Sequence, residues 1–439
     1  MPELTSDHVL HVEGGRPLQG RIGISGSKNA SLALMAASIL TDEPVRLRNV
    51  PRIADTALMG EILSALGGSV EQDPEGVLVL RAERISSTVP AHLARRMRAS
   101  IVLLGALLAR EGEARLPRPG GDQIGARRVE QHIRGLRSMG AQVTEGSTDF
   151  VARAPGRLRG ARIVLDLPTV TGTENLVMAA ALARGTTEIF NAAREPHVQD
   201  LCRLLQKMGA SIQGAGTDVI VVEGVDRLSG TEHRVVPDYL EAGTFAIAVA
   251  ATGGDVVMED SPHRDLTQVL LKLEQAGAVV ETGADTVRVS RDPERPLEAV
   301  DMVTWVHPGF ATDLQAQYMA LMTQAKGETV IWEPLFENRF RQVPELVRMG
   351  AEISVRGRDA VVSGPTLLRG AEVLVPDIRS GAALVIAALC ARGPSRLKEA
   401  WHIDRGYQDL ASKLAHLGAA IERRGPDCSH HPRPLPTLD

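Results

Sequence analysis

The sequence predicts a mixed α/β fold in which six βαβαββ repeats form two bundles of three. Two observations lead to this prediction. An apolar residue, a glycine and a small residue end an amphipathic stretch at six places, and successive glycines lie 68 to 73 residues apart; a fixed period of this kind indicates repeated structural units. Each interval also contains an Ala- and Leu-rich segment that is apolar nearly all round, which is typical of a helix buried on every side. The six glycines are Gly67, Gly140, Gly209, Gly277, Gly350 and Gly418.

The first repeat shows the expected order of elements. Residues 20–25 alternate in polarity as a half-buried strand does, and residues 32–40 predict an apolar helix. Residues 44–50 predict a second strand, and residues 56–66 predict an amphipathic helix that Gly67 ends. One or two further strands complete the repeat, and the other five repeats follow the same order.

The first helix of each repeat is expected inside its bundle, with the sheets around it. These apolar segments are residues 32–40, 101–109, 176–183, 245–251, 316–322 and 382–389. We expect residues 28–236 to form the first three-repeat domain, and residues 1–27 with 237–424 to form the second.

The end of the chain differs in composition from the repeats. Residues 425–439 are rich in proline and polar residues, which predicts a disordered tail. Its Cys428, His430 and His431 either bind a metal ion or belong to an untethered end.

Composition excludes several classes of partner. The chain has 49 basic and 54 acidic residues and a formal charge of −5, too balanced for a nucleic-acid or anionic membrane surface. Aromatic residues make up only 3%, so few rings are available to stack on bases. The longest apolar runs, residues 101–109 and 381–391, are far shorter than the roughly 20 residues that cross a bilayer. Three cysteines without a CxxC pair fit a reducing compartment, so we expect a cytoplasmic protein. We also expect a monomer.

Polar residues recur at two positions of the repeat. The first position is the start of the first helix, with Lys28, Arg98, Thr171, Asp238, Glu241, Asp313, Asp377 and Arg379. The second position is the expected start of the second helix, with Asp55, Arg127, Glu195, Arg264, Arg339 and Arg405.

These two sets of polar residues, which we call the first and second registers, favour an anion-binding site. A charge at the end of a buried helix is costly unless it faces a cavity or a partner, and a basic group there shares the positive end of the helix dipole. Cations and free backbone N–H groups together would hold an anion. The cations suit phosphates plus a carboxylate; they are Lys28, Arg98, Arg127, Arg339, Arg379 and Arg405. The alternative is that these residues cap helices and form ordinary ion pairs.

Two acids are candidates for proton transfer. Residues 116–127 contain two prolines and three glycines, so this segment is expected to be a loop. It is either a mobile lid that brings Asp122 over the substrate as an acid, or a solvated turn. Asp313, at a helix start, is placed as a base. Nucleotide-binding and metal-binding motifs such as GxxxxGK[ST], GxGxxG and HExxH are absent from the sequence, so we expect no cofactor and no metal.

Eleven segments together resemble the enolpyruvyl transferase family over about residues 10–424, and the first and last of them are typical of its UDP-sugar branch. They are ISGSKNA (24–30), RASIVLLGALLA (98–109), GGDQIGARRVEQHI (120–133), TVTGTENLVMAA (169–180), AAREP (192–196), PDYLEAGTF (237–245), HPGFATDLQAQ (307–317), FENRF (336–340), VPELVRMGA (343–351), DIRSGAALV (377–385) and HIDRGY (402–407).

The resemblance implies a fold and a reaction. The family fold is two inside-out α/β barrels with the active site in the cleft between them. The implied reaction transfers the enolpyruvyl group of phosphoenolpyruvate to the 3-hydroxyl of UDP-N-acetylglucosamine and releases phosphate. It passes through a tetrahedral addition–elimination intermediate, needs no cofactor, and is the first committed step of peptidoglycan synthesis, on which cell shape and division depend.

The resemblance also implies roles for single residues. Asp122 would protonate phosphoenolpyruvate and Asp313 would take the proton of the sugar hydroxyl. Phosphoenolpyruvate would be held by Lys28, Asn29, Arg127 and Arg405. The UDP-sugar would be held by Asn29, Arg98, Arg127, Arg128, Val129, Glu130, Gln131, Leu167, Pro168, Thr169, Val170, Asp313 and Leu335. The charged cleft would be completed by Asp55, Arg339, Asp377 and Arg379.

The chain departs from the family pattern at several positions. Asp122 stands where most members have the cysteine that fosfomycin alkylates; a carboxylate is a far poorer nucleophile than a thiolate, so we expect fosfomycin insensitivity. The other departures are Ala54, Arg128, His197 and Tyr239. They are either neutral or indicate a paralogue with another nucleotide or UDP-sugar acceptor. A third hypothesis, a catalytically inactive scaffold or sensor, does not explain why an anion clamp and an acid–base pair occur together.

Overall fold

The computed structural model describes residues 8–424 and divides the chain into two compact units. The first unit comprises Gly26–Asp122 and Arg127–Val236. The second comprises residues 8–25, Gln123–Ala126 and residues 237–424. Each unit has its own cluster of buried apolar side chains. The predicted tail, with Cys428, His430 and His431, lies outside the described residues.

The first unit is built from short helices and strands. Its helices are α1 (Lys28–Ala37), α2 (Ala54–Ala65), α3 (Ala91–Ala94), α4 (Leu103–Glu111), α5 (Glu130–Ser138), α6 (Val170–Ala181) and α7 (Pro196–Lys207), with the 3-10 turns η1 (Ser38–Leu40) and η2 (Arg98–Val102). Its strands are β3 (Val45–Arg48), β4 (Ser69–Gln72), β5 (Leu78–Arg81), β6 (Glu113–Pro117), β7 (Gln142–Glu145), β8 (Asp149–Arg153), β9 (Arg162–Val164), β10 (Thr186–Phe190), β11 (Ser211–Gln213), β12 (Val219–Glu223) and β13 (Thr231–Arg234).

The second unit repeats this design. Its helices are α8 (Tyr239–Thr252), α9 (Thr267–Gln275), α10 (Gln315–Met322), α11 (Val343–Arg348), α12 (Ile378–Cys390), α13 (Trp401–Asp404) and α14 (Leu410–His416), with η3 (His263–Leu266) and η4 (Thr312–Leu314). Its strands are β1 (Val9–Glu13), β2 (Leu18–Gly23), β14 (Gly254–Glu259), β15 (Val279–Thr282), β16 (Thr286–Arg291), β17 (Leu297–Glu298), β18 (Met302–Val303), β19 (Ala325–Trp332), β20 (Glu352–Arg356), β21 (Asp359–Gly364), β22 (Glu372–Leu374), β23 (Pro394–Lys398) and β24 (Ala420–Arg424).

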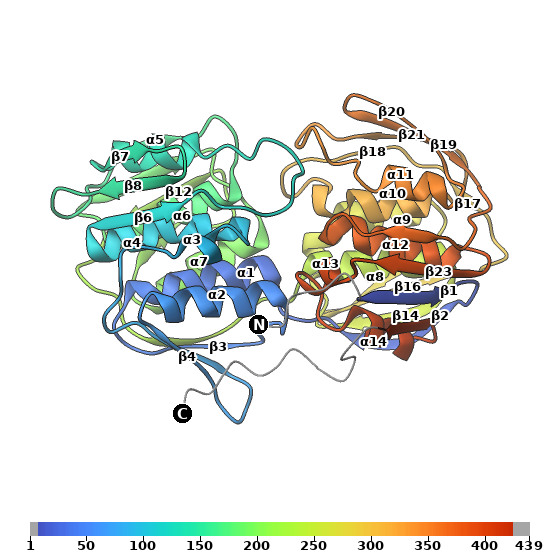
Figure 1. Ribbon diagram of the computed structural model, residues 1–439, viewed down its shortest axis with the longest axis horizontal. Coiled ribbons are helices and arrows are strands. Elements are labelled where there is room, and N and C mark those ends of the chain that lie inside the picture. Colours follow the sequence, from blue (N-terminus) through green and yellow to red (C-terminus); the bar gives the residue numbers. More distant parts are fainter. Residues whose placement is uncertain (1–7, 425–439) are drawn as a thin grey trace. The chain divides into compact units, whose positions relative to one another are not determined.

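Among residues 8–424, five of the six sheets share one four-strand topology, to which the fifth repeat adds β18, whereas the sheet of the second repeat has only the three antiparallel strands β6, β8 and β7. Figure 1 shows the sheets around the helices within each unit. In the third repeat, β9 pairs in parallel with β10, which pairs antiparallel with β12, and β12 pairs antiparallel with β11. The parallel pair needs a crossover, which the buried first helix supplies. Among residues 8–424 none of the six sheets closes on itself, so each inside-out unit consists of three open sheets around its helices.

The strand predicted at residues 20–25 was assigned to the wrong repeat. The observed strand β2 pairs in parallel with β14, in the sheet of the fourth repeat, and the first repeat takes β13 beside β3 instead. In the sixth repeat β1 lies between β23 and β24. Alternating polarity specifies a strand and its buried face, but it does not specify the partner strand, so the sequence pattern missed this exchange.

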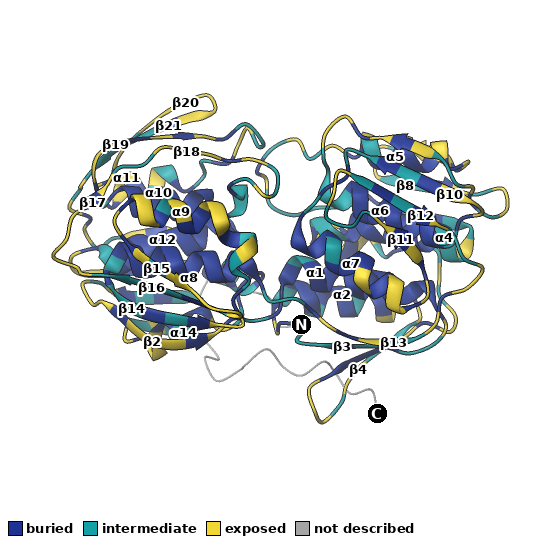
Figure 2. Cartoon of the chain, turned by 180° about the vertical axis from the view of Figure 1, so that it is seen from behind, coloured by how far each residue is buried: buried dark blue, intermediate teal, exposed yellow. Residues whose placement is uncertain are grey.

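The predicted burial of the first helices is confirmed, and Figure 2 shows them in dark blue inside each unit. In the first unit these helices are α1, α4 and α6; in the second they are α8, α10 and α12. Every residue of α10 is buried, as is every residue of α8 from Tyr239 to Ala251. Within residues 8–424, no helix has both the length and the apolar character needed to cross a membrane.

A buried polar junction joins the helices of the first unit. The Asn175 side chain on α6 donates to the Ile101 carbonyl at 2.8 Å and accepts from the Gly105 amide at 2.6 Å. A Cβ at Gly105 would lie 2.3 Å from the Asn175 carbonyl oxygen, so this close approach requires glycine. Asn175 Nδ2 also lies 2.9 Å from Nδ1 of His132, whose Nε2 lies 3.3 Å from the Thr171 hydroxyl. Because the Asn175 amide can only donate to the ring, the His132 Nδ1 is unprotonated.

Candidate active site

Two of the predicted site residues, Lys28 and Asp55, form an ion pair at the start of α1. The Ser27 hydroxyl caps this helix by accepting from the Ala30 amide at 3.3 Å, and Lys28 follows as its first residue. The Lys28 ammonium lies 2.8 Å from the Asp55 carboxylate, in the first turn of α2. The two side chains are 11% and 4% exposed, so this is a buried ion pair between the first two helices of the unit.

Arg98 and Arg127 form a second cationic group in the first unit. The Arg98 guanidinium donates to the Arg127 carbonyl, and the Arg127 guanidinium donates to the Asp122 carbonyl. Burial, together with the positive charge of Arg127, lowers the pKa of Arg98 to about 10. These contacts place two guanidinium groups close together, an arrangement that suits an anionic ligand.

The loop before Arg127 is anchored at its glycines. Residues 118–129 form neither helix nor strand, whereas Leu116 and Pro117, which were predicted to be part of this loop, end strand β6. A Cβ at Gly120 would lie 1.7 Å from the Arg95 carbonyl oxygen, and Gly121 has φ +98° with its Cβ position 2.8 Å from Arg98. Only glycine fits these two places, so the backbone directly before Asp122 is packed closely against Arg95 and Arg98. Gln123–Ala126 belongs to the second unit, where the Asn338 amide donates to the Ile124 carbonyl at 3.1 Å.

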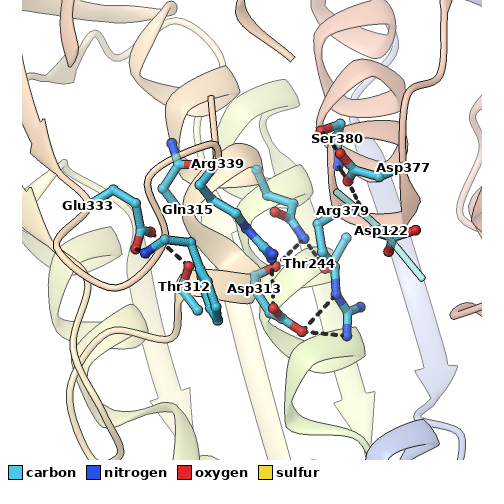
Figure 3. A network of polar contacts seen from close by, with 12 residues as sticks. Asp122, Thr244, Thr312, Asp313, Gln315, Glu333, Arg339, Asp377, Arg379 and Ser380 are labelled. Atoms are coloured by element: carbon cyan, nitrogen blue, oxygen red, sulfur yellow. Dashed lines mark hydrogen bonds and ion pairs between the residues drawn. The ribbon is translucent and has the colours of Figure 1, made fainter. Parts of the chain in front are cut away.

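In the second unit, Asp313 is held between two buried arginines (Figure 3). Oδ1 lies 2.6 Å from Nη2 of Arg339, and Oδ2 lies 3.1 and 3.0 Å from Nε and Nη2 of Arg379. The arginine side chains are 5% and 6% exposed, whereas that of Asp313 is 28% exposed. Burial alone would lower the pKa of Arg379, but neighbouring Tyr407, Asp313 and Asp238 raise it above its ordinary value. The geometry leaves an accessible carboxylate in a fixed orientation, which suits a base.

Two other acids of the first register are helix caps. Asp377 accepts from the amides of Arg379 and Ser380 at 3.1 and 2.9 Å and from the Ser380 hydroxyl at 2.8 Å. Asp238 accepts from the amides of Leu240 and Glu241. The capping interpretation therefore holds for both, and Asp377 contributes by fixing the turn that carries Arg379.

The predicted second register is wrong for its arginines. Arg127, Arg339 and Arg405 lie in loops before α5, α11 and α14, and Arg264 lies in η3 before α9. Asp55 and Glu195, in contrast, lie at the starts of α2 and α7. At these two places the acidic side chain is stabilised by the positive end of the helix dipole.

Most of the residues expected at the UDP-sugar lie in two segments of the first unit, the start of α5 and the turn before α6. The Gln131 amide oxygen accepts from the backbone amides of Asp166 and Leu167 at 2.6 and 3.3 Å, and its nitrogen donates to the Leu167 carbonyl at 3.2 Å. Gln131 therefore holds the turn that precedes α6. Thr169 caps α6 through the Gly172 amide. The flanking residues Arg128, Glu130 and Leu167 are exposed, Asn29, Pro168 and Val170 are half-buried, and Val129 is buried.

Four polar residues near Asp313 were not predicted. Buried Glu333 accepts from the amides of Leu335 and Phe336 and from the Thr312 hydroxyl at 2.7 Å, so it holds the loop of Leu335 beside η4. The other three are Thr244, Gln317 and Tyr407. These three lie in the segments PDYLEAGTF, HPGFATDLQAQ and HIDRGY, and the available signal was a polar residue in an otherwise apolar helix or segment.

The departures from the family pattern fall in ordered structure. Tyr239 is 6% exposed and lies edge-on to His307, with ring centroids 6.3 Å apart. His197 is 3% exposed in the first turn of α7, and Ala54 begins α2.

Among residues 8–424, no group of three or more His, Cys, Asp or Glu side chains is arranged to hold a metal ion.

Comparison with known proteins identifies the family of this chain. The sequence model of one protein family, EPSP synthase (3-phosphoshikimate 1-carboxyvinyltransferase), matches residues 12–414. The chain belongs to the EPSP synthase family. A relative within it, UDP-N-acetylglucosamine 1-carboxyvinyltransferase of Sorangium cellulosum (strain So ce56), is 50% identical over 94% of this chain and 98% of its own.

Solved structures of an enolpyruvyl transferase and of an EPSP synthase have the same fold. The enolpyruvyl transferase NikO from Streptomyces tendae matches with a TM-score of 0.85 and 27% identity, over 96% of this chain and 99% of its own. EPSP synthase from Acinetobacter baumannii matches with a TM-score of 0.74 and 19% identity, over 95% and 100%. The predicted fold and family are confirmed.

Proposed function

We propose that this member of the EPSP synthase family transfers the enolpyruvyl group of phosphoenolpyruvate to the 3-hydroxyl of UDP-N-acetylglucosamine. The observation that carries the proposal is the 50% identity, over nearly the full length of both chains, to an enzyme named for this reaction. The buried Lys28–Asp55 pair and the Asp313 carboxylate between two arginines supply the cationic groups and the base that it needs.

The chemistry assigns one proton transfer to each acid. Asp122 protonates the methylene carbon of phosphoenolpyruvate, and the neighbouring carbon becomes electrophilic. The sugar 3-hydroxyl attacks that carbon while Asp313 takes the hydroxyl proton, which gives a tetrahedral intermediate. The Asp122 carboxylate then takes a proton back from the new methyl group while phosphate leaves, which restores the double bond. General acid and base catalysis of this kind contributes about 10²- to 10⁴-fold each.

The remaining residues of the proposed site bind charge and fix orientation. Lys28, Asn29, Arg127 and Arg405 hold phosphoenolpyruvate. The UDP-sugar is bound by Arg98, Arg128, Val129, Glu130, Leu167, Pro168, Thr169, Val170 and Leu335, with Gln131 holding the Leu167 turn. We also propose that the enzyme is a cytoplasmic monomer, that it supplies peptidoglycan synthesis and so cell shape and division, and that fosfomycin does not inhibit it.

The test is phosphate release from phosphoenolpyruvate by the purified protein, with and without UDP-N-acetylglucosamine, before and after incubation with fosfomycin. Release that depends on the acceptor and is unchanged by fosfomycin is the expected result. Absence of release with this acceptor would contradict the proposed function. Inhibition together with a covalent fosfomycin adduct on Asp122 would contradict the antibiotic proposal alone.

A second candidate is an enolpyruvyl transferase with another nucleotide or UDP-sugar acceptor. It is favoured by the packing of Tyr239 on His307, which fills with an aromatic ring a position where the family pattern has a basic side chain. The same assay with a panel of UDP-sugars and nucleosides separates the two candidates, since the better acceptor is the one with the higher kcat/KM.

A further inference from the structure

One buried tyrosine side chain contacts residues of three central helices of the second unit. The Tyr407 side chain, in the turn after α13, is 2% exposed. Its hydroxyl oxygen lies 2.9 Å from Oγ1 of Thr244 on α8 and 3.1 Å from Nε2 of Gln317 on α10. Its ring lies against α12, with the guanidinium carbon of Arg379 5.2 Å from the ring centroid.

The hydrogen-bond directions in this cluster are determined. The Thr244 hydroxyl donates to the Leu240 carbonyl at 2.8 Å, so its oxygen accepts the proton of the Tyr407 hydroxyl. Gln317 can only donate through Nε2, and this nitrogen lies 3.1 Å from the Tyr407 oxygen, 3.0 Å from the Asp313 carbonyl oxygen and 3.2 Å from Oγ1 of Thr244. Tyr407 therefore donates to Thr244 and accepts from Gln317.

Tyr407 reaches Asp313 by two routes. Through Gln317 it acts on the Asp313 backbone, which Gln317 holds at the start of α10. Through Arg379 it acts on the Asp313 carboxylate, because a cation over an aromatic face is attracted to the ring and the same guanidinium binds Oδ2. Figure 3 shows Thr244, Asp313 and Arg379 converging from their three elements.

We propose that Tyr407 is a positioning residue for Asp313: it fixes the spacing between α10 and Arg379 and so the direction of the carboxylate. This inference rests on the proposed function, in which Asp313 is the base. A displacement of about 1 Å can cost about 10²-fold in rate, so the hydroxyl and its hydrogen bonds matter for kcat although Tyr407 touches no substrate in this scheme.

The test is the Tyr407→Phe variant, with Tyr318→Phe as its matched control. Tyr318 is also buried and lies on α10, but its hydroxyl donates to the Val300 carbonyl at 2.8 Å, away from Asp313. We expect Tyr407→Phe to lower kcat about 10- to 100-fold while KM for both substrates changes less than about threefold, and Tyr318→Phe to keep kcat. Equal kcat in the two variants, or a loss confined to KM, would overturn the proposal.

A second pair of variants serves if Tyr407→Phe does not fold. Thr244→Ser keeps the acceptor of the Tyr407 proton, whereas Thr244→Val has nearly the same shape without it. Lower kcat in Thr244→Val and near-normal kcat in Thr244→Ser support the proposal, and equal kcat in both overturns it.

A crystal structure of the best-folded variant separates this inference from the proposed function. Wild-type protein that releases no phosphate refutes the proposed function. In that case, loss of the Arg379–Asp313 contacts in the variant still supports positioning by Tyr407, and retention of these contacts refutes it.

Discussion

The Lys28 ammonium and the Asp55 carboxylate lie 2.8 Å apart at the adjoining ends of α1 and α2, and both are almost completely buried. Removing one partner of a buried pair leaves an uncompensated charge, at a cost of about 3 to 5 kcal/mol. A substrate anion that binds Lys28 would take over part of the role of Asp55.

Asp55→Asn is therefore expected to lower the melting temperature of the protein without substrate and to enlarge the increase caused by phosphate or phosphoenolpyruvate. Thermal unfolding with and without each anion measures both effects. Asp226→Asn is the control, because Asp226 pairs with Arg157 while 98% exposed and should change neither quantity. The same increase in Asp55→Asn as in wild type would contradict anion binding at Lys28.

Asp122 can be tested by two substitutions in the same loop. Asp122→Asn removes the proton donor with little change of shape and should lower kcat about 10²-fold or more. Asp122→Cys restores a group that can donate a proton and adds a nucleophile, so it should keep activity and become sensitive to fosfomycin. Phosphate release and mass spectrometry of the intact protein measure both. Full activity in Asp122→Asn would show that another group protonates the substrate.

Gln131 is expected to affect the binding of the UDP-sugar rather than the chemical step. Gln131→Leu removes the three hydrogen bonds that hold the Asp166–Leu167 backbone, so the turn before α6 loses its fixed position. We expect KM for UDP-N-acetylglucosamine to rise about 10-fold, with KM for phosphoenolpyruvate and kcat changed little. Steady-state kinetics with each substrate varied in turn is the measurement, and unchanged acceptor KM would exclude the turn from the site.

His132 makes the stability of the protein depend on pH. Burial, and then the positive charge of Arg98, lower the pKa of His132 to about 3 from 6.5. Below pH 6.5 the unfolded chain binds a proton that the folded chain does not bind until about pH 3. The free energy of unfolding therefore falls as the pH is lowered from 6.5, by about 1.4 kcal/mol per pH unit from this group.

His132→Asn keeps an acceptor for the Asn175 amide but cannot titrate. Between pH 7 and pH 5 the wild type should lose about 2 kcal/mol more than this variant, measured by urea unfolding at each pH. His416→Asn, at an exposed position on α14, should lose stability as the wild type does. Parallel pH curves for His132→Asn and wild type would show that another group is responsible.

Much of the fold could be predicted because its signals are local. The glycine that ends each second helix and the apolar first helix are properties of short segments, and both are found in all six repeats. The same holds for Lys28, Asp313 and Arg379, whose position at a helix start follows from the repeat. Strand partners are not local, so β2 was assigned to the first repeat although it pairs with β14.

The polar contacts around Asp313 could not be predicted for a similar reason. Thr244, Gln317 and Tyr407 come from three different repeats and meet only when α8, α10 and α12 pack. In the sequence each is one polar residue among apolar neighbours. Their function depends on direction and distance, which neither periodicity nor composition encodes.

The placement of β1 between β23 and β24 imposes an order on folding during synthesis. The first unit can be completed once residue 236 has left the ribosome, since its segments lie between Gly26 and Val236. The second unit must wait until Arg424 has emerged, because β1 gains its neighbour β23 only at Lys398 and its other neighbour β24 only at Arg424. Until Lys398 has emerged, β1 has neither neighbouring strand on the nascent chain, a state in which strands associate with other chains. Its five residues and the charged Glu13 at its end limit that hazard.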